Sequence, residues 1–236
     1  MTNLEFSLGF DILWNNIMSN IAPGLNPYEK SVFLTKSQSE LLKNYFNPKG
    51  NKYGEGFGDS SKRDIDFSSL ITVISPPQKG EGDFLNGSYS FSLPDNIMFI
   101  LNETCSVTKD GKQRELVILP VKHQELTRLL SKPFKAPYKN QCWRLLANAE
   151  DTTVADIFPG YNCTDCSYKI RYIRYPNPII LESLKNGLTI DGKSDESECE
   201  LPEEIHQEIL QRAVEIAKAA WSGDETASVT IGNRSE

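Results

Sequence analysis

The stretch that decides the fold is IMFILNETCSVTKDGKQRELVIL, residues 97–119. Two β-rich runs, 97–108 and 113–119, flank the four residues from Lys109 to Lys112. An Asp-Gly pair between two such runs favours a tight hairpin turn, because its backbone needs positive φ angles that these residues tolerate. The pattern therefore predicts an antiparallel β-hairpin in the middle of the chain.

Strand-like runs continue on both sides of the hairpin. Residues 167–175, SYKIRYIRY, alternate between polar and apolar side chains. This alternation places Lys169 and Arg171 on one face, where a solvated strand surface is favoured over a phosphate site. Further strand-like runs lie at 65–75, 88–93 and 141–147, and a short helix is predicted at 121–131.

Both ends of the chain are patterned as helices. The first helix is predicted over 6–21, and the second has the start signals Asn26 as cap, Pro27 at the first helical position and Glu29 in a capping box. Phe33 lies opposite the apolar side of the second helix, so it is either buried by another neighbour or presented to a partner. The two apolar faces comprise Phe10, Leu13, Trp14, Ile17 and Ile21, and Leu34, Leu41, Leu42, Tyr45 and Phe46.

The last helix is predicted over 201–221, and its apolar arc covers about half of its circumference. A helix that packs on one side needs a stripe little wider than about 100°. The wide arc therefore indicates either contacts with both the parent domain and a partner, or a helix sunk deep in its own fold. The arc contains Ile205, Ile209, Leu210, Ala213, Val214, Ile216, Ala217, Ala220 and Trp221.

These patterns predict an α+β fold, with a central antiparallel β-sheet flanked by N-terminal and C-terminal helices. The expected segments are an N-terminal helical segment with a glycine-rich loop at 1–62, a β-rich core at 63–200 and a C-terminal helix at 201–221. A polar, disordered tail is expected at 222–236.

Composition narrows the class of protein. The chain has 236 residues, a formal net charge of -7 and five cysteines. The acidic balance and the scattered basic residues do not suit a nucleic-acid-binding protein. We expect no membrane span, because no run approaches about 18 apolar residues. Residues 1–10 lack a basic signal-peptide region, so we expect no secretion and no disulfide framework.

The sequence offers little catalytic chemistry. The glycine-rich loop at 47–62 lacks the Lys-Ser/Thr pair of a phosphate-binding loop and follows a helix. His123 and His206 lie in no motif for metal binding or nucleophilic catalysis. We therefore predict no catalytic, cofactor-binding or metal-binding residues and no enzymatic activity.

Cys163-Thr164-Asp165-Cys166 is the one motif with possible chemistry. It follows Pro159-Gly160 and precedes a predicted strand, so two reduced cysteines in a turn are the favoured interpretation. The alternative is a small zinc-dependent binding or regulatory module, whose remaining ligands would come from distant cysteines or histidines. A redox role would require a helix start in a βαβ unit, which this context does not offer.

Three parts of the chain together resemble virion structural proteins of crAss-like bacteriophages, in particular the ring proteins of the neck and tail barrel below the portal. The first part is FDILWNNIMSNIAPGLNPYEKSVFLTKSQSELL at 10–42, continuing through the glycine-rich loop to KRDIDFSSL at 62–70. The others are IRYIRYPNPIIL at 170–181 and ELPEEIHQEILQRAVEIAKAAW at 200–221.

The resemblance implies a head-to-tail connector subunit without catalytic residues or cofactors. Such proteins form homo-oligomeric rings, here expected to be twelve-fold, that contact the portal or other tail rings. Genomic DNA would pass through the lumen without specific binding. The chain would be a virion component of the neck or tail, present in the host cytoplasm during assembly.

We expect the subunit contacts to come from the N-terminal helices, the 47–62 loop and the last helix. Ring formation uses head-to-tail contacts, so two different patches of each subunit must be complementary. The substitutions Phe33→Asp and Val214→Asp are expected to block assembly and leave the monomer folded.

Overall fold

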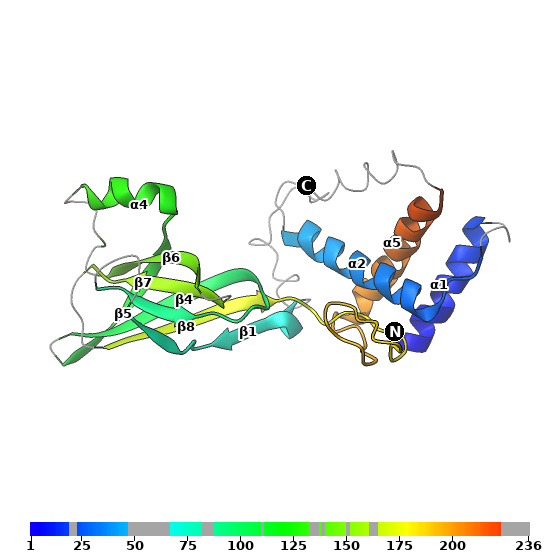
Figure 1. Cartoon of the computed structure of the whole chain (residues 1–236), viewed down its shortest axis with the longest axis horizontal. Coiled ribbons are helices and arrows are strands. Elements are labelled where there is room, and N and C mark those ends of the chain that lie inside the picture. Colours follow the sequence, from blue (N-terminus) through cyan, green and yellow to red (C-terminus); the bar gives the residue numbers. More distant parts are fainter. Residues whose placement is uncertain are drawn as a thin grey trace. The chain divides into compact units, whose positions relative to one another are not determined.

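The computed structural model divides the chain into two compact units (Figure 1). The helical unit comprises Met1–Ser69 and Pro176–Glu236, and the sheet unit comprises Leu70–Tyr175. The structure describes residues 1–18, 23–46, 67–81, 87–109, 111–132, 137, 140–149, 152–160 and 165–222. The predicted loop at 47–62 and the tail beyond residue 222 lie outside these residues.

The sheet unit is built around one eight-stranded sheet with the order β1-β8-β4-β5-β6-β7-β3-β2. A 3₁₀ turn, Ser68–Leu70, leads into it, and a short helix α4, His123–Leu130, connects β5 to β6. The strands are β1 (Ile71–Ile74), β2 (Gln78–Glu81), β3 (Tyr89–Ser92), β4 (Ile97–Lys109), β5 (Lys112–Pro120), β6 (Gln141–Ala149), β7 (Thr152–Phe158) and β8 (Asp165–Arg174).

The predicted hairpin is confirmed. Strands β4 and β5 pair antiparallel up to Lys109 opposite Lys112, which leaves a two-residue turn. Gly111 in that turn has φ +70, the left-handed region that favours glycine. The predicted central sheet is antiparallel at every described strand pair except one, because β5 and β6 are parallel. Parallel neighbours need a long crossover, and here the chain supplies one that contains α4.

The sheet curls strongly upon itself. Its two edge strands, β1 and β2, are consecutive in the sequence and are separated only by residues 75–77. A linker of that length spans at most about 14 Å, whereas the edges of a flat eight-stranded sheet would lie about 34 Å apart. The connection therefore forces the sheet to bend until its edges approach each other, which gives a concave interior and a convex outer face.

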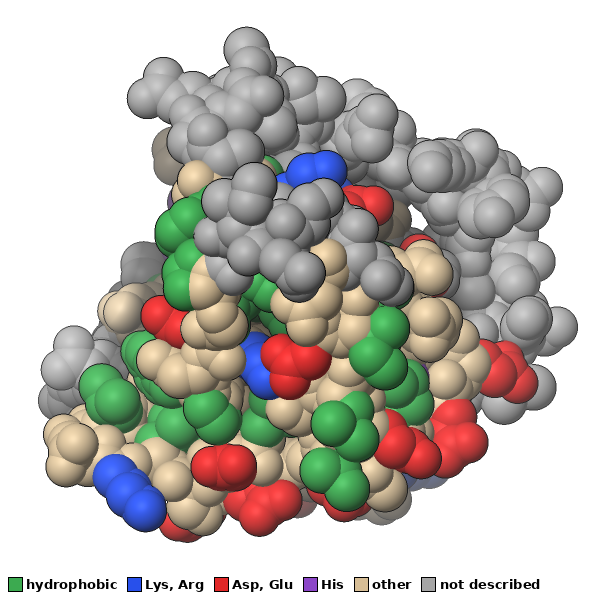
Figure 2. Space-filling view, turned by 90° about the vertical axis from the view of Figure 1, so that its right-hand side faces the viewer, with side chains coloured by type: hydrophobic (Ala, Val, Ile, Leu, Met, Phe, Trp, Pro, Cys, Tyr) green, Lys and Arg blue, Asp and Glu red, His purple; other side chains and the backbone are tan. Residues whose placement is uncertain are grey.

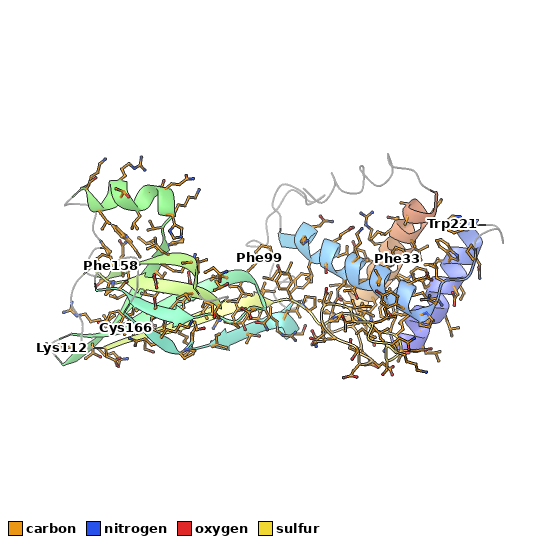
Figure 3. The ribbon with its side chains drawn as sticks, viewed as in Figure 1. Phe33, Phe99, Lys112, Phe158, Cys166 and Trp221 are labelled. Atoms are coloured by element: carbon orange, nitrogen blue, oxygen red, sulfur yellow. The ribbon has the colours of Figure 1, made fainter. Side chains whose placement is uncertain are left out.

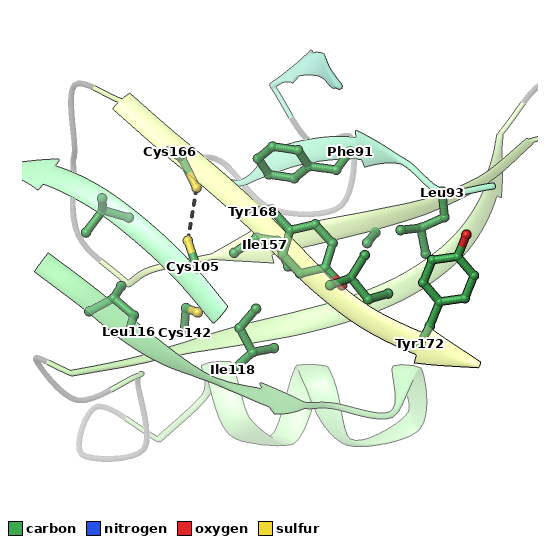
Figure 4. Packing of buried hydrophobic residues seen from close by; sticks show 13 residues of the cluster. Phe91, Leu93, Cys105, Leu116, Ile118, Cys142, Ile157, Cys166, Tyr168 and Tyr172 are labelled. Carbon is green, nitrogen blue, oxygen red and sulfur yellow. Dashed lines mark hydrogen bonds between the residues drawn. The ribbon is translucent and has the colours of Figure 1, made fainter. Parts of the chain in front are cut away.

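The concave side holds the core of the sheet unit (Figure 4). Strand β8 shows the pattern clearly, because Tyr168, Ile170 and Tyr172 are buried while Lys169 and Arg171 are exposed. This confirms the alternation predicted from the sequence. The core comprises Phe91, Leu93, Cys105, Val107, Leu116, Ile118, Cys142, Ala155, Ile157, Cys166, Tyr168, Ile170 and Tyr172.

Among its described residues, the helical unit contains three helices: α1 (Asn3–Met18), α2 (Pro27–Phe46) and α5 (Glu203–Ser222). The predicted start of α2 is confirmed in detail. The backbone N–H of Glu29 donates to Asn26 Oδ1 at 2.8 Å, and the Asn26 N–H donates to Glu29 Oε2 at 2.8 Å. This reciprocal pair is a capping box, which satisfies two otherwise free backbone donors.

Helix α5 packs against both α1 and α2. These two contacts account for its wide apolar arc. Of the two interpretations of the arc, the helix sunk deep in its own fold is therefore the one that the structure supports. Val214 is only 1% exposed, so it belongs to the core and not to a surface. At the end of the helix, Ala220 is exposed and Trp221 is 51% exposed. The buried residues are Ile205, Ile209, Leu210, Ala213, Val214, Ile216 and Ala217.

The chain that follows the sheet, residues 176–202, is fastened to the helices by hydrogen bonds to buried groups. The Leu181 N–H donates to Ser31 Oγ at 3.0 Å, and the Ile179 N–H donates to Thr35 Oγ1 at 3.1 Å. Asn3 Nδ2 donates to the Ile180 carbonyl at 3.2 Å. These contacts order a segment that has little regular secondary structure of its own. The α+β class predicted from the sequence is confirmed.

Candidate interaction surfaces

The outer face of α1 carries an exposed apolar stripe. Leu4, Leu8 and Ile12 are 69%, 54% and 60% exposed. Their four-residue spacing places them on one side of the helix, opposite the buried side chains of Phe6 and Phe10. We call Leu4, Leu8 and Ile12 the outer stripe. Exposed apolar side chains in a continuous row are typical of surfaces that bind another protein.

The sequence did not predict the outer stripe. The predicted apolar face of this helix contained Phe10 and Trp14, which are buried, and Leu13, which is half-buried. The helix also begins at Asn3 rather than at residue 6, so the first member of the stripe fell outside the predicted element. The sequence does contain the pattern that indicates the stripe: Leu4, Leu8 and Ile12 form a second apolar row at four-residue spacing.

Acidic side chains accompany the outer stripe. Helix α1 contains Glu5 and Asp11 and no lysine or arginine. Glu5 is exposed and holds the start of the helix, because its Oε2 accepts from the Thr2 N–H at 2.8 Å. Figure 2 looks onto the side of the molecule that carries α1 and shows hydrophobic side chains with acidic groups among them. A partner for this surface should combine apolar and basic side chains.

The convex face of the sheet carries both apolar and basic side chains. Val117 is 61% exposed and Val73 is 45% exposed, and both lie on the side opposite the core. Between them on the same face are Lys169 and Arg171 of β8. We call Val73, Val117, Leu119, Lys169 and Arg171 the convex patch.

The register of the strands fixes the order of side chains across the convex patch. Arg171 is directly opposite Val73 of β1, and Lys169 is opposite Thr104 of β4, which in turn is opposite Val117 of β5. Neither Lys169 nor Arg171 has a salt bridge or side-chain hydrogen bond among the described residues. Their charges are therefore available to a partner. The next outward row contains Glu115, where the basic region ends.

A buried polar cluster lies on the concave side of the same strands. Arg144 Nη1 donates to Glu103 Oε1 at 2.8 Å, and the side chains are only 12% and 9% exposed. The Tyr168 hydroxyl also donates to Glu103 Oε1. Burial, together with the charge of Glu103, raises the pKa of Tyr168 well above its usual range. Tyr168 is therefore a neutral hydrogen-bond donor, and the cluster ties β4, β6 and β8 together.

Three thiols meet in the core of the sheet. Cys105 and Cys166 have their sulfur atoms 3.2 Å apart, and Cys142 is buried close to them (Figure 4). Hydrogen bonds from Cys142 and Cys166 lower the pKa of Cys105, while burial acts in the opposite direction. Cys163 lies outside the described residues. The side chain of Cys166 points into the core, which does not suit a zinc site at the predicted turn.

The described residues contain no group of three His, Cys, Asp or Glu side chains that could hold a metal ion. The two histidines serve other contacts. His123 Nε2 lies 2.6 Å from the Leu146 carbonyl oxygen in β6. His206 Nε2 donates to the Leu201 carbonyl at 2.7 Å, while its Nδ1 accepts from the amino group of Met1 at 2.7 Å.

A shallow depression of about 370 Å³ lies at the end of the sheet near the β3–β4 connection. Phe99 and Leu146 line it with other apolar side chains, and Asp95 is the one titratable side chain among the described lining residues. A single carboxyl group offers no acid–base pair and no activated nucleophile. Figure 3 marks the position of Phe99 in the sheet unit, together with Phe158 and Cys166.

Some residues of the segments predicted to form subunit contacts are buried, and others are partly exposed. Val214 is buried, so the prediction that Val214→Asp leaves the monomer folded is wrong: the new carboxylate would be buried without a partner. Phe33 is half-buried on α2 and Trp221 is half-exposed at the end of α5 (Figure 3). Of the described helices, none is long and apolar enough to cross a membrane.

An exposed apolar helix face is typical of proteins that assemble with other chains. Comparison with known sequences identifies the class. The model of the phage tail ring protein 3/4 family matches residues 1–228, and the chain belongs to this family.

Two proteins of Bacteroides phage crAss001 are among the relatives. Ring protein 4/5 is 48% identical over 244 residues, which cover 98% of each chain. Ring protein 3 is 35% identical over 226 residues, which cover 92% of the present chain and 95% of the relative. The predicted resemblance to crAss-like phage ring proteins is confirmed, and with it a structural ring role in the virion.

Proposed function

We propose that the chain forms a closed ring of identical subunits in the connector between portal and tail, in the neck or the tail barrel. The observation that carries the proposal is the family match over nearly the whole chain, which includes both units. The exposed outer stripe and convex patch add surfaces suited to subunit contacts. Twelve copies are expected, and the portal and other tail rings are the proposed neighbours.

Stacking with related rings follows from the same family. Two different ring proteins of one phage are each similar to this chain over more than nine-tenths of its length. Chains that share a fold can share the upper and lower surfaces through which rings meet. We therefore place this subunit among other rings of the same family, assembled in the host cytoplasm and then retained in the particle.

The proposed ring surrounds the channel through which the genome leaves. A net charge of -7 disfavours tight binding to phosphates, because such binding depends on lysine and arginine that displace counterions. DNA would pass without specific contacts. The role is mechanical, and the proposal includes no catalytic residue, cofactor or metal.

Quantitative mass spectrometry of purified virus particles tests this function. The expected result is a constant copy number close to that of other single-ring components, measured against the capsid protein. If the chain is absent from particles and abundant only in infected cells, the proposed function is wrong. Phe33→Asp provides a second test, because the predicted contact through α2 requires that this variant folds and is excluded from particles.

A further inference from the structure

We propose that the outer stripe of one subunit docks on the convex patch of a second copy of this chain. The inference rests on the proposed ring function and names the surfaces that join neighbouring subunits within the ring. A ring of identical subunits needs two different complementary surfaces on each subunit. The outer stripe belongs to the helical unit and the convex patch to the sheet unit, so every chain carries one of each.

The two surfaces are complementary in charge. Helix α1 has no basic side chain; its Asp11 is paired with Lys30 of α2 at 2.7 Å, which leaves Glu5 exposed beside Leu4 and Leu8. The convex patch has Lys169 and Arg171 exposed, without salt bridges among the described residues. Docking would bring the acidic helix onto the basic strand while the apolar side chains of both surfaces leave water.

The dimensions also agree. From Leu4 to Ile12 the helix rises about 12 Å, at about 1.5 Å per residue. From β1 to β5 the convex patch crosses three strand spacings, or about 14 Å. A helix laid across the strands can thus contact Val73 and Val117 with its ends while Glu5 faces the β8 cations.

Pairing of α1 with α1 of another copy fits less well. That contact would offer the exposed Glu5 no basic side chain of α1, whereas Lys169 and Arg171 of the convex patch can balance its charge. It would also be symmetric and would close as a dimer, whereas a ring requires a head-to-tail contact. The convex patch of a second copy is therefore the occupant that satisfies both charge and symmetry.

Two single substitutions test the contact on the full-length chain. Leu8→Asp disrupts the outer stripe, and Val117→Asp disrupts the convex patch. Both positions are more than half exposed, so circular dichroism and thermal unfolding should match the wild type. Sedimentation velocity, over a concentration series that reaches the millimolar range, then measures self-association of each variant and of their equimolar mixture.

The expected result is specific to a head-to-tail contact. The wild type forms species larger than a dimer, and each variant alone self-associates at least tenfold more weakly. In the mixture, Leu8→Asp still offers its convex patch and Val117→Asp still offers its outer stripe, so one intact contact forms and assembly stops at a heterodimer. Leu188→Asp, at a 43% exposed apolar position of the helical unit, is the matched control and should assemble like the wild type.

Three results, besides the absence of a heterodimer from the mixture, would overturn the proposed contact. They are assembly of Leu8→Asp like the wild type, dimerisation of Val117→Asp alone, and a wild type that stays monomeric throughout the series. If Val117→Asp is misfolded, Lys169→Glu with Arg171→Glu replaces it. If the chain has ring copy number in particles but the mixture forms no heterodimer, the docking is wrong and the proposed ring function stands.

Discussion

Replacement of Glu103 by leucine should open the sheet unit selectively. Glu103 is the common acceptor for Arg144 and Tyr168, and both carboxylate and guanidinium are almost fully buried. Leucine removes the only anion that the structure places on Arg144 among the described residues. Arg144 Nε already lacks a hydrogen-bond partner there, so the guanidinium would be left buried and uncompensated.

The expected magnitude follows from that geometry. Removing one partner of a buried ion pair costs about 3–5 kcal/mol, mainly because the other charge remains desolvated. At about 1.4 kcal/mol per factor of ten, the population of the opened sheet should rise roughly 150- to 4,000-fold.

The buried thiols provide the assay. Cys105, Cys142 and Cys166 are at most 3% exposed, so a thiol reagent reaches them only when the sheet opens. Cys199 of the helical unit serves as an internal reference. Burial raises its pKa to about 11, and its reaction rate should not change in the variant. Labelling rates are read for each cysteine by peptide mass spectrometry.

A matched variant separates loss of the charge balance from loss of packing. Combining Glu103→Leu with Arg144→Met and Tyr168→Phe removes all polar members of the cluster, and most of the lost stability should return. If Glu103→Leu leaves the labelling of the three core thiols unchanged, the cluster does not hold the sheet together. The same conclusion follows if the triple variant is as unstable as the single one.

Three further predictions concern the helical unit. Val214→Asp should lower the free energy of unfolding in urea by about 3 kcal/mol or more, because it buries an unpaired carboxylate. Ala220→Asp, at an exposed position, should be tolerated. Equal effects of the two substitutions would contradict the burial of this face of α5. Asn26→Ala should lose about 1 kcal/mol of thermal stability through the cap of α2, and Asn26→Asp should retain it. Burial lowers the pKa of His206 in the folded chain, so the unfolded chain takes up a proton first as the pH falls. The stability that neutral His206 contributes is therefore complete above about pH 6.5 and is lost as the pH falls toward the folded-state pKa. Thermal melts of His206→Gln should show a flatter pH dependence over that window.

Much of the fold could be predicted because local signals agree with the tertiary structure. The Asp-Gly turn, the capping box at Asn26 and the alternation along β8 each have a local physical cause, and all three were found in the structure. Strand β7 was not predicted, because Val154 to Ile157 are all buried and no alternation is visible. Strand β2 was not predicted because its four residues, QKGE, are polar or small.

The interaction surfaces were harder to predict, since they depend on what remains uncovered. The wide apolar arc of α5 indicated a possible partner, but α1 and α2 of the same chain cover it. Helix α1 has two apolar sides, and the sequence alone does not say which side lies against α5. The convex patch depends on strand order, because β8 and β1 pair although almost 100 residues separate them. The cluster of Cys105, Cys142 and Cys166 likewise requires the register of the sheet.

The ring that we propose for this chain is closed and lies on the axis between portal and tail. A single-particle reconstruction of the neck and tail of purified virus particles tests it most directly. We expect a ring of twelve identical subunits, each fitted by both units of this chain, around an open channel. A particle whose neck and tail contain no density for this fold would refute the proposed ring.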